Sequence, residues 1–120
     1  MRILLLEDHN FFGDEVAEYL HDDLHYEVCY AHNYDQAIDL INQYDHFDYS
    51  FIDVLLQNGR TGIDVVSNYE KQLGKIMFIT GCADTPTLDR IKKYASASKL
   101  FEIWPKIQCF LKGEKVSITS

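Results

Sequence analysis

Positive charge is what this sequence has little of. Its 120 residues include 11 lysine and arginine residues against 19 aspartate and glutamate residues, which gives a formal net charge of −8 at pH 7. A protein that binds nucleic acid or an anionic membrane by itself needs a basic surface. The charge balance therefore argues against direct binding of either, and no nucleic-acid or membrane partner is expected.

The sequence also lacks a long hydrophobic run and a paired-cysteine motif. The apolar stretch in "MRILLLEDHN" is too short for a signal peptide or a membrane span, so a cytoplasmic location is expected. The three cysteines, Cys29, Cys82 and Cys109, are scattered, and no Cys-x-x-Cys pair occurs. This spacing indicates reduced thiols that pack as small apolar groups.

The composition that remains is that of one ordinary globular domain. Hydrophobic residues make up 47% of the chain and charged residues 25%, a balance that argues against disorder. A chain of 120 residues is long enough to bury a substantial core. No repeat, low-complexity tract or internal linker is evident. We expect one domain over residues 1–112, with 113–120 as a tail or the start of a linker.

Short apolar segments alternate with segments of helical periodicity along the chain. Cap signals precede three of the helical segments, at Asn33, Thr61 and Thr85-Pro86. Five strands alternating with five helices predict an α/β fold, a doubly wound parallel sheet with helices on both faces. The predicted strands are Arg2–Leu6, Glu27–Ala31, Asp48–Asp53, Lys75–Thr80 and Lys99–Ile103.

Acidic side chains follow two of the predicted strands. Glu7 and Asp8 come directly after the first strand, and Asp53 ends the third. In a parallel α/β sheet these ends meet at one edge, where ligands bind. Two unit charges 4 Å apart repel by about 4 kcal/mol at an effective dielectric constant of about 20. The cluster therefore needs a cation or a shared proton, and a hard, oxygen-preferring ion such as Mg²⁺ fits.

The spaced segments "LLLEDH", "FIDVLL", "FITG" and "FEIWP" resemble the receiver domain of two-component response regulators, a CheY-like domain of the flavodoxin-like fold. The resemblance covers nearly the whole chain. It implies that Asp53 accepts a phosphoryl group, and that Glu7, Asp8, Asp53 and the backbone carbonyl of Leu55 hold Mg²⁺. It also implies that Thr80 binds the phosphoryl group and that Phe101 is the aromatic switch residue.

One departure from that family pattern concerns the fifth strand. The family normally has a lysine before the proline there, which pairs with the phosphoryl oxygens, whereas this sequence has Trp104 before Pro105. We therefore expect a cis Trp104–Pro105 bond, an indole beside the site and weak retention of the phosphoryl group. A second departure is "LLQNGRTG" after Asp53, in which Asn58-Gly59 predicts an unusual turn.

Plainer interpretations exist for each residue alone: a solvated acidic pair, a turn aspartate, a β-branched strand residue, a core phenylalanine. Three hypotheses for function follow. The first is a receiver phosphorylated by a histidine kinase or a histidine phosphotransfer protein, with a homodimer or downstream partner on the face of the fourth and fifth helices. The second is a pseudo-receiver that acts as a protein-interaction module, and the third is a Mg²⁺-dependent phosphohydrolase. The third ranks last because Leu55 stands where a second acid is needed, so we expect no enzyme.

Overall fold

Five parallel strands form the centre of the molecule. A computed structural model describes residues 1–56, 61–81, 85–99 and 103–117, and in it the strand order is β2-β1-β3-β4-β5. All four strand pairs are parallel. This order is that of the flavodoxin-like fold, so the predicted fold class is confirmed. The strands are β1 (Arg2–Leu6), β2 (Glu27–Ala31), β3 (Tyr49–Asp53), β4 (Lys75–Thr80) and β5 (Ala95–Ser98).

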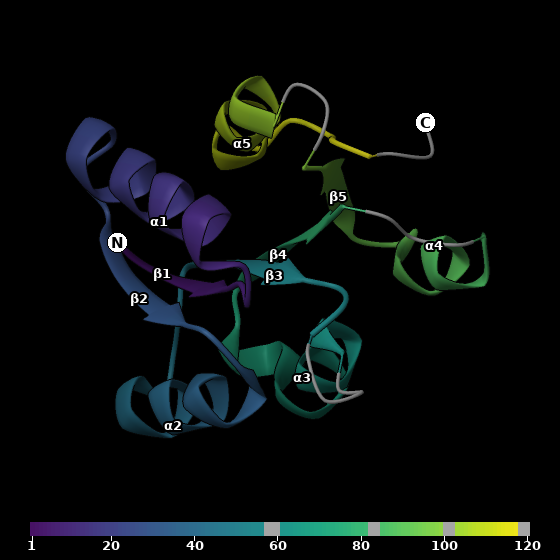
Figure 1. The fold of residues 1–120 in the computed structure, drawn as a ribbon, viewed down its shortest axis with the longest axis horizontal. Coiled ribbons are helices and arrows are strands. Elements are labelled where there is room, and N and C mark those ends of the chain that lie inside the picture. The colour runs from purple at the N-terminus through teal and green to yellow at the C-terminus, as the bar shows by residue number, and fades with distance from the viewer. Residues whose placement is uncertain (57–60, 82–84, 100–102, 118–120) are drawn as a thin grey trace.

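Helices cover both faces of the sheet. Figure 1 shows α1 and α5 on one face and α2 and α3 on the other. Each face has its own hydrophobic core, one packed by α1 and α5 and one by α2, α3 and the end of α4. The helices are α1 (Asn10–Glu18), a π-helical turn η1 (Tyr19–Asp23), α2 (Tyr34–Tyr44), α3 (Gly62–Tyr69), a 3-10 turn η3 (Glu70–Gln72), α4 (Thr85–Ile91) and α5 (Ile103–Leu111).

Two of the predicted helix caps are confirmed. The Asn33 side chain accepts a hydrogen bond from the Gln36 backbone N–H at 2.8 Å, and α2 begins there. Thr61 and Asp64 form a capping box at the start of α3. The helices are short, with 11 residues in α2. Within the described ranges, no helix has the length and apolar character needed to cross a bilayer.

The fifth strand is not where the hydrophobic pattern predicts it. The predicted range was Lys99–Ile103, but β5 is Ala95–Ser98, and Ile103 begins α5. The prediction was wrong because β5 consists of alanine and serine only. These small residues are nevertheless buried, since Ser96 and Ala97 expose 2% and 0% of their surfaces. Residues 100–102, with the predicted switch residue Phe101, lie outside the described residues.

The segment after α5 packs against β5. The side chain of Val116 is 7% exposed and belongs to the core on the α1 and α5 face. Its backbone carbonyl accepts a hydrogen bond from the Ser96 backbone N–H at 3.2 Å. The domain boundary at residue 112 stays a prediction, but residues as far as 116 take part in the packing.

Candidate functional site

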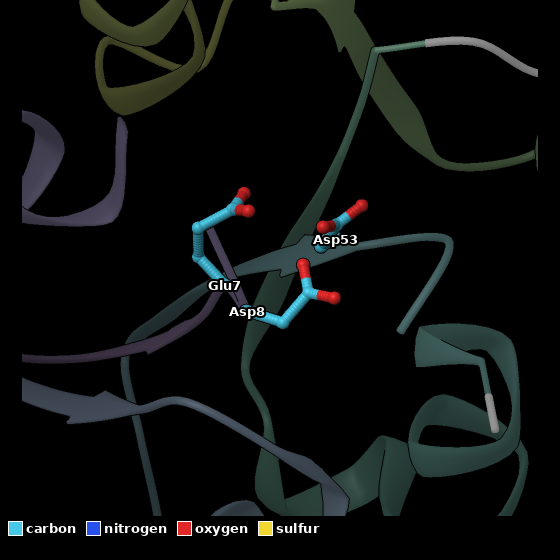
Figure 2. A group of neighbouring side chains, drawn as sticks. All are labelled: Glu7, Asp8 and Asp53. Atoms are coloured by element: carbon cyan, nitrogen blue, oxygen red, sulfur yellow. The ribbon is translucent and has the colours of Figure 1, made fainter. Parts of the chain in front are cut away.

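Three carboxylates lie together at the carboxyl edge of the sheet. Glu7, Asp8 and Asp53 each offer an oxygen, and these oxygens lie within 4.8 Å of one another. Figure 2 shows the three side chains gathered where β1 and β3 end. Glu7 and Asp53 expose only 1% and 3% of their surfaces. The adjacent pairing of β1 with β3 brings the carboxylates together, as the sequence predicts.

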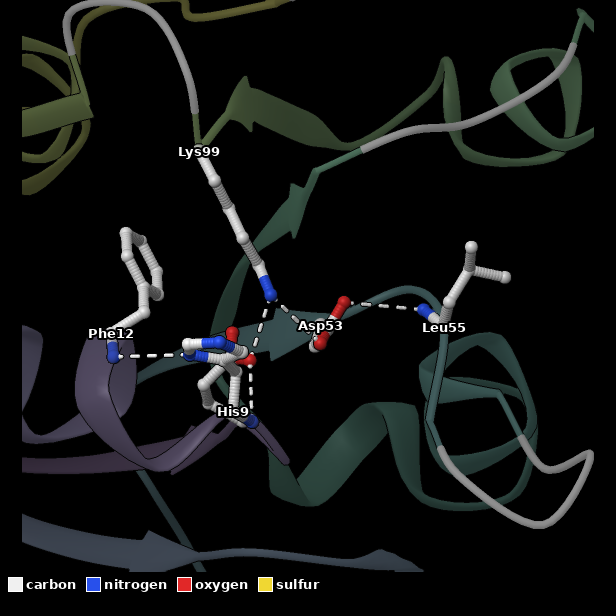
Figure 3. A network of polar contacts seen from close by, with 6 residues as sticks. His9, Phe12, Asp53, Leu55 and Lys99 are labelled. Carbon is white, nitrogen blue, oxygen red and sulfur yellow. Dashed lines mark hydrogen bonds and ion pairs between the residues drawn. The ribbon is translucent and has the colours of Figure 1, made fainter.

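A lysine that the sequence analysis missed neutralises part of this charge. Lys99 Nζ lies 2.7 Å from Glu7 Oε1 and 3.1 Å from Asp53 Oδ2 (Figure 3). Lys99 directly follows β5, and its backbone N–H donates to the Thr80 carbonyl at 2.9 Å, which continues the β4–β5 pairing by one residue. The ammonium also lies 5.2 Å from the centre of the Phe12 ring, so contacts on several sides hold it over the carboxylates.

Trp104 therefore does not take the position beside the carboxylates that the sequence analysis predicted for it. It lies in the first turn of α5, packs edge-to-face on Tyr19 at 5.2 Å between ring centres, and lines a shallow pocket with acidic residues of α1 and η1. The predicted cis bond to Pro105 is also wrong, because no described peptide bond is cis. Lys99, at the end of β5, is the residue whose ammonium reaches the site, and Leu100 follows it in place of the expected proline.

The turn after β3 fixes the orientation of Asp53. The backbone N–H of Leu55 donates to Asp53 Oδ1 at 3.2 Å. Gly62 packs so closely on this turn that an added Cβ would stand 2.1 Å from the Asp53 carbonyl oxygen. Leu55 also forms an isolated antiparallel bridge with Thr61 and leaves 50% of its surface exposed. The predicted Asn58-Gly59 turn lies outside the described residues, and metal binding by the Leu55 carbonyl stays a prediction.

Thr80 closes the site on the side of β4. It ends that strand, exposes 4% of its surface, and its Oγ1 has no hydrogen-bond partner among the described residues. A buried hydroxyl without a partner costs about 1–3 kcal/mol. A side chain in this state is suited to bind an incoming polar group. Lys99 joins Thr80 to the carboxylates, because it bonds the Thr80 carbonyl through its backbone and Asp53 through its ammonium.

The electrostatics of the site favour a cation. Burial, together with the Glu7 charge, raises the pKa of the Asp53 carboxyl to about 8, although Lys99 partly offsets both effects. Burial lowers the pKa of Lys99, but its contacts with Glu7 and Asp53 outweigh burial and leave that pKa raised. Near neutral pH the metal-free site thus favours the protonated form of Asp53, whereas the Lys99 ammonium stays charged.

The donor set fits a hard divalent ion. Glu7 Oε2 is buried and has no hydrogen-bond partner within the described part of the chain, although Oε1 of the same carboxylate is bonded. Asp8 adds a half-buried carboxylate, and Asp53 a buried one. Three oxygen donors with an excess of negative charge are the ligands that Mg²⁺ prefers. Glu7, Asp8 and Asp53 are therefore the residues that would hold it.

His9 is a second residue of the site that the sequence did not predict. Its backbone N–H donates to Glu7 Oε1 at 3.0 Å, and its Nδ1 accepts from the Phe12 N–H at 3.4 Å, which caps α1 (Figure 3). The sequence places His9 directly before α1, in the capping position, but histidine is not among the usual capping residues. The position of Lys99 could have been recognised as a strand end, because it directly follows the four small residues Ala95–Ser98 that form β5.

Comparison with solved structures identifies the fold. A CheY-like response regulator receiver domain from Methanospirillum hungatei superposes with a TM-score of 0.80 at 19% identity, over 93% of this chain and 91% of that one. The signal receiver domain of a DNA-binding response regulator from Colwellia psychrerythraea gives a TM-score of 0.78 at 19% identity, over 94% and 96%. No protein-family model and no curated protein matches the sequence.

A third structure contains a modified aspartate. This response regulator from Burkholderia pseudomallei, solved with a phosphorylated aspartic acid, a calcium ion and citrate, gives a TM-score of 0.77 at 23% identity. The match covers 90% of this chain and 64% of that one, so this chain spans somewhat less than two thirds of the Burkholderia protein. The chain thus has the fold of response regulator receiver domains, and the likeness suggested by its sequence motifs is confirmed for the fold.

Proposed function

We propose that this chain is a receiver domain that accepts a phosphoryl group on Asp53 from a histidine kinase or a histidine phosphotransfer protein. One observation carries the proposal. A buried aspartate ends a central strand in contact with an ammonium at 3.1 Å, and an acidic pair from the neighbouring strand lies beside it. A nucleophilic carboxylate, a cation site and a fixed positive charge are the groups that phosphoryl transfer to an aspartate needs.

The transfer forms one bond and breaks one. A carboxylate oxygen of Asp53 attacks phosphorus, the new O–P bond forms, and the P–N bond of a phosphohistidine breaks with the imidazole as leaving group. The Leu55 N–H holds Asp53 Oδ1, which fixes the orientation of the carboxylate. Lys99 offsets negative charge on the phosphoryl oxygens, and the unpartnered Thr80 hydroxyl donates a hydrogen bond to one of them.

Charge repulsion is the main obstacle to this reaction, because the phosphodonor and the site are both anionic. Glu7, Asp8 and Asp53 would hold a Mg²⁺ ion, which would supply positive charge at this point. Lys99 alone leaves the three carboxylates in excess. The same proposal includes the backbone carbonyl of Leu55 as a further Mg²⁺ ligand.

The two alternatives lose support from the geometry. The pseudo-receiver hypothesis depended on Trp104 in place of a lysine and on the altered loop after Asp53. Lys99 provides the ammonium, whereas residues 57–60 of that loop lie outside the described residues. A phosphohydrolase of this kind is expected to have a second acid two residues after the nucleophile, and the side chain at that position is the half-exposed, apolar Leu55. We therefore propose a phosphoryl-accepting signalling domain and no turnover enzyme.

An exposed aromatic side chain near the site supports docking of a phosphodonor protein. Phe11 lies in the first turn of α1, three residues after Asp8, and exposes 73% of its surface. Exposed aromatic residues are common anchors of protein interfaces. A homodimer or a downstream partner on the face of α4 and α5 stays a prediction.

Labelling with acetyl phosphate tests the proposal. The chain is incubated with acetyl phosphate and MgCl₂ or EDTA, and intact-protein mass spectrometry then counts the phosphoryl groups. We expect one phosphoryl group with Mg²⁺, removable by hydroxylamine as an acyl phosphate is, and little label with EDTA. Asp53→Asn should carry no label. Equal labelling of the parent chain and Asp53→Asn would contradict the proposal, and repeated release of phosphate would favour the phosphohydrolase.

A further inference from the structure

A groove of about 590 Å³ lies between the start of β4, the end of the α4 segment and the residues after α5. The groove and the acidic site lie at opposite edges of the sheet. The groove forms at the amino ends of β4 and β5, whereas the carboxylates lie at the carboxyl ends of β1 and β3. The side chains and backbone that line it are Lys75, Ile76, Lys92, Lys93, Tyr94, Ala95, Phe110, Gly113, Glu114, Lys115, Val116 and Ser117.

The rim of the groove is basic. Lys75, Lys92, Lys93 and Lys115 are all exposed and line it, together with one acid, Glu114. Four of the chain's 11 lysine and arginine residues therefore surround one groove of a protein whose net charge is −8. These lysines come from three separate segments of the chain, so folding, and not a run of charge in the sequence, brings them together.

The floor of the groove is apolar. Ile76, Phe110 and Val116 are buried, with 6–7% of their surfaces exposed. Tyr94 lies at the wall, where the Lys93 ammonium stands 5.1 Å from the centre of its ring and its hydroxyl donates to Glu70. The Ser96–Val116 backbone hydrogen bond fixes the segment after α5 as the opposite wall. Figure 1 shows this segment passing from α5 to the side of the molecule that carries β5.

We propose that this groove binds an acidic segment of a protein partner, one with an apolar side chain between its carboxylates. The charge complementarity of the lysine rim selects a partner that is locally acidic. The apolar floor, reached through that rim, accommodates an apolar side chain of the segment. Such a site needs no phosphorylation, so the proposal does not rest on the function assigned to Asp53.

Two other anionic ligands match the groove less well. A nucleic acid extends its charge well beyond 590 Å³ and would meet the acidic remainder of a chain with net charge −8. A small inorganic anion would use the ammonium groups and leave the apolar floor unfilled. A peptide of a few residues places both charge and apolar surface where the groove has their complements.

Titration followed by NMR tests this site in the full 120-residue chain without a phosphodonor. The probe is the capped peptide Glu-Asp-Phe-Glu-Asp, with Gln-Asn-Phe-Gln-Asn and Glu-Asp-Ser-Glu-Asp as matched peptides. We expect shifts of the backbone amides of Tyr94, Ala95 and Val116, and little shift near Asp53. Each matched peptide should bind more weakly, the uncharged one by at least about tenfold.

Charge reversal separates the groove from general electrostatics. Lys92→Glu with Lys115→Glu should weaken binding of the charged peptide by at least about tenfold. The control, Lys71→Glu with Lys112→Glu, changes net charge equally at exposed positions that do not line the groove, and should stay within about twofold. All four lysines are exposed, so both variants should keep the parent's amide spectrum elsewhere.

Several results would overturn the proposal. They are the absence of shifts at millimolar peptide, equal weakening by both double variants, and equal binding of the serine peptide. Tighter binding of a single-stranded oligonucleotide would assign the groove to nucleic acid. Equal shifts with inorganic phosphate would leave only a non-selective anion site. None of these results bears on the labelling of Asp53, so the two proposals fail independently.

Discussion

At the scale of single residues, the ammonium of Lys99 holds two buried carboxylates in one site. Its distances of 2.7 Å to Glu7 and 3.1 Å to Asp53 are those of charge-assisted hydrogen bonds. Removing one partner of a buried ion pair leaves the other charges uncompensated, at a cost of about 3–5 kcal/mol. The burial of Glu7 and Asp53 in the metal-free protein therefore depends on this lysine.

Lys99→Met removes the charge and keeps most of the side-chain length. We expect acetyl phosphate labelling of Asp53 to become slower by about tenfold or more, because a charge-assisted hydrogen bond contributes about 1.5–3 kcal/mol. Lys71→Met, at an exposed position on η3, should label like the parent chain. Rates are compared at a single Mg²⁺ and donor concentration. An unchanged rate in Lys99→Met would remove this lysine from the proposed mechanism.

Asp53→Asn should stabilise the metal-free protein at neutral pH. Burial and Glu7 raise the pKa of Asp53 to about 8, so the folded state disfavours its ionised form. Such a group contributes its full stability below its unfolded pKa, near 3.8, and loses it as the pH rises through about 8. The gain from the substitution should therefore grow between these pH values, and reach on the order of 2 kcal/mol at pH 8, since the lost ion pair with Lys99 offsets part of it.

Urea unfolding in EDTA from pH 5 to pH 9 measures this gain. Asp39→Asn serves as the control, because that carboxylate is exposed on α2, outside the site. A gain that is constant over the pH range, or equal in both variants, would mean that Asp53 is not held in an unfavourable charged state.

At the scale of elements, strand ends decide what the sequence could and could not predict. β1 and β3 are largely apolar; Glu7 directly follows β1 and Asp53 ends β3, so the positions of both acids followed from the pattern. β5 has no apolar run, because its alanine and serine residues pack close to neighbouring elements. The apolar residues that follow Lys99 were therefore read as the strand. That shift of four residues placed Trp104 at the site and concealed Lys99.

Substitution of Trp104 should leave the phosphorylation of Asp53 unchanged. It packs on Tyr19 in α5, so Trp104→Phe keeps the aromatic contact, and Trp104→Lys places a charge beside the acidic residues of α1 and η1. We expect both variants to label Asp53 within about twofold of the parent, since neither changes a group that contacts the site. A marked gain in labelling by Trp104→Lys would revive the hypothesis that this position limits phosphorylation.

The contact between α3 and the turn after β3 depends on Gly62. An alanine Cβ there would meet the Asp53 carbonyl oxygen at 2.1 Å and Ile52 Cγ2 at 2.4 Å, and a backbone atom in a central strand cannot move away easily. Gly62→Ala should lower the free energy of unfolding by about 1–3 kcal/mol. Gly81→Ala is the matched control, because its Cβ would meet only Lys99 Cδ at 3.7 Å. Equal unfolding midpoints in urea would contradict this account.

At the scale of the whole molecule, charge acts in two ways that experiment can separate. With a net charge of −8, the acidic side chains over the whole surface repel one another, and any salt screens that repulsion. The acidic side chains at the edge of the sheet lie within 4.8 Å of one another, and a proton or an ion bound between them relieves their repulsion locally. Stabilisation by Mg²⁺ is therefore informative only when compared with a monovalent salt of equal ionic strength.

Mg²⁺ should raise the melting temperature of the parent chain beyond the effect of that matched salt. With few protein ligands we expect dissociation in the millimolar range, so a tenfold excess over the dissociation constant stabilises by about 1.4 kcal/mol. For a domain of 120 residues this corresponds to a rise of about 4–6 °C. Asp8→Asn should lose most of the rise, because Asp8 offers a ligand but forms no ion pair with Lys99 within the described part of the chain. Differential scanning calorimetry with MgCl₂, matched NaCl and EDTA distinguishes the cases, and an equal rise with NaCl would mean that screening, and not an ion at the carboxylates, accounts for the effect.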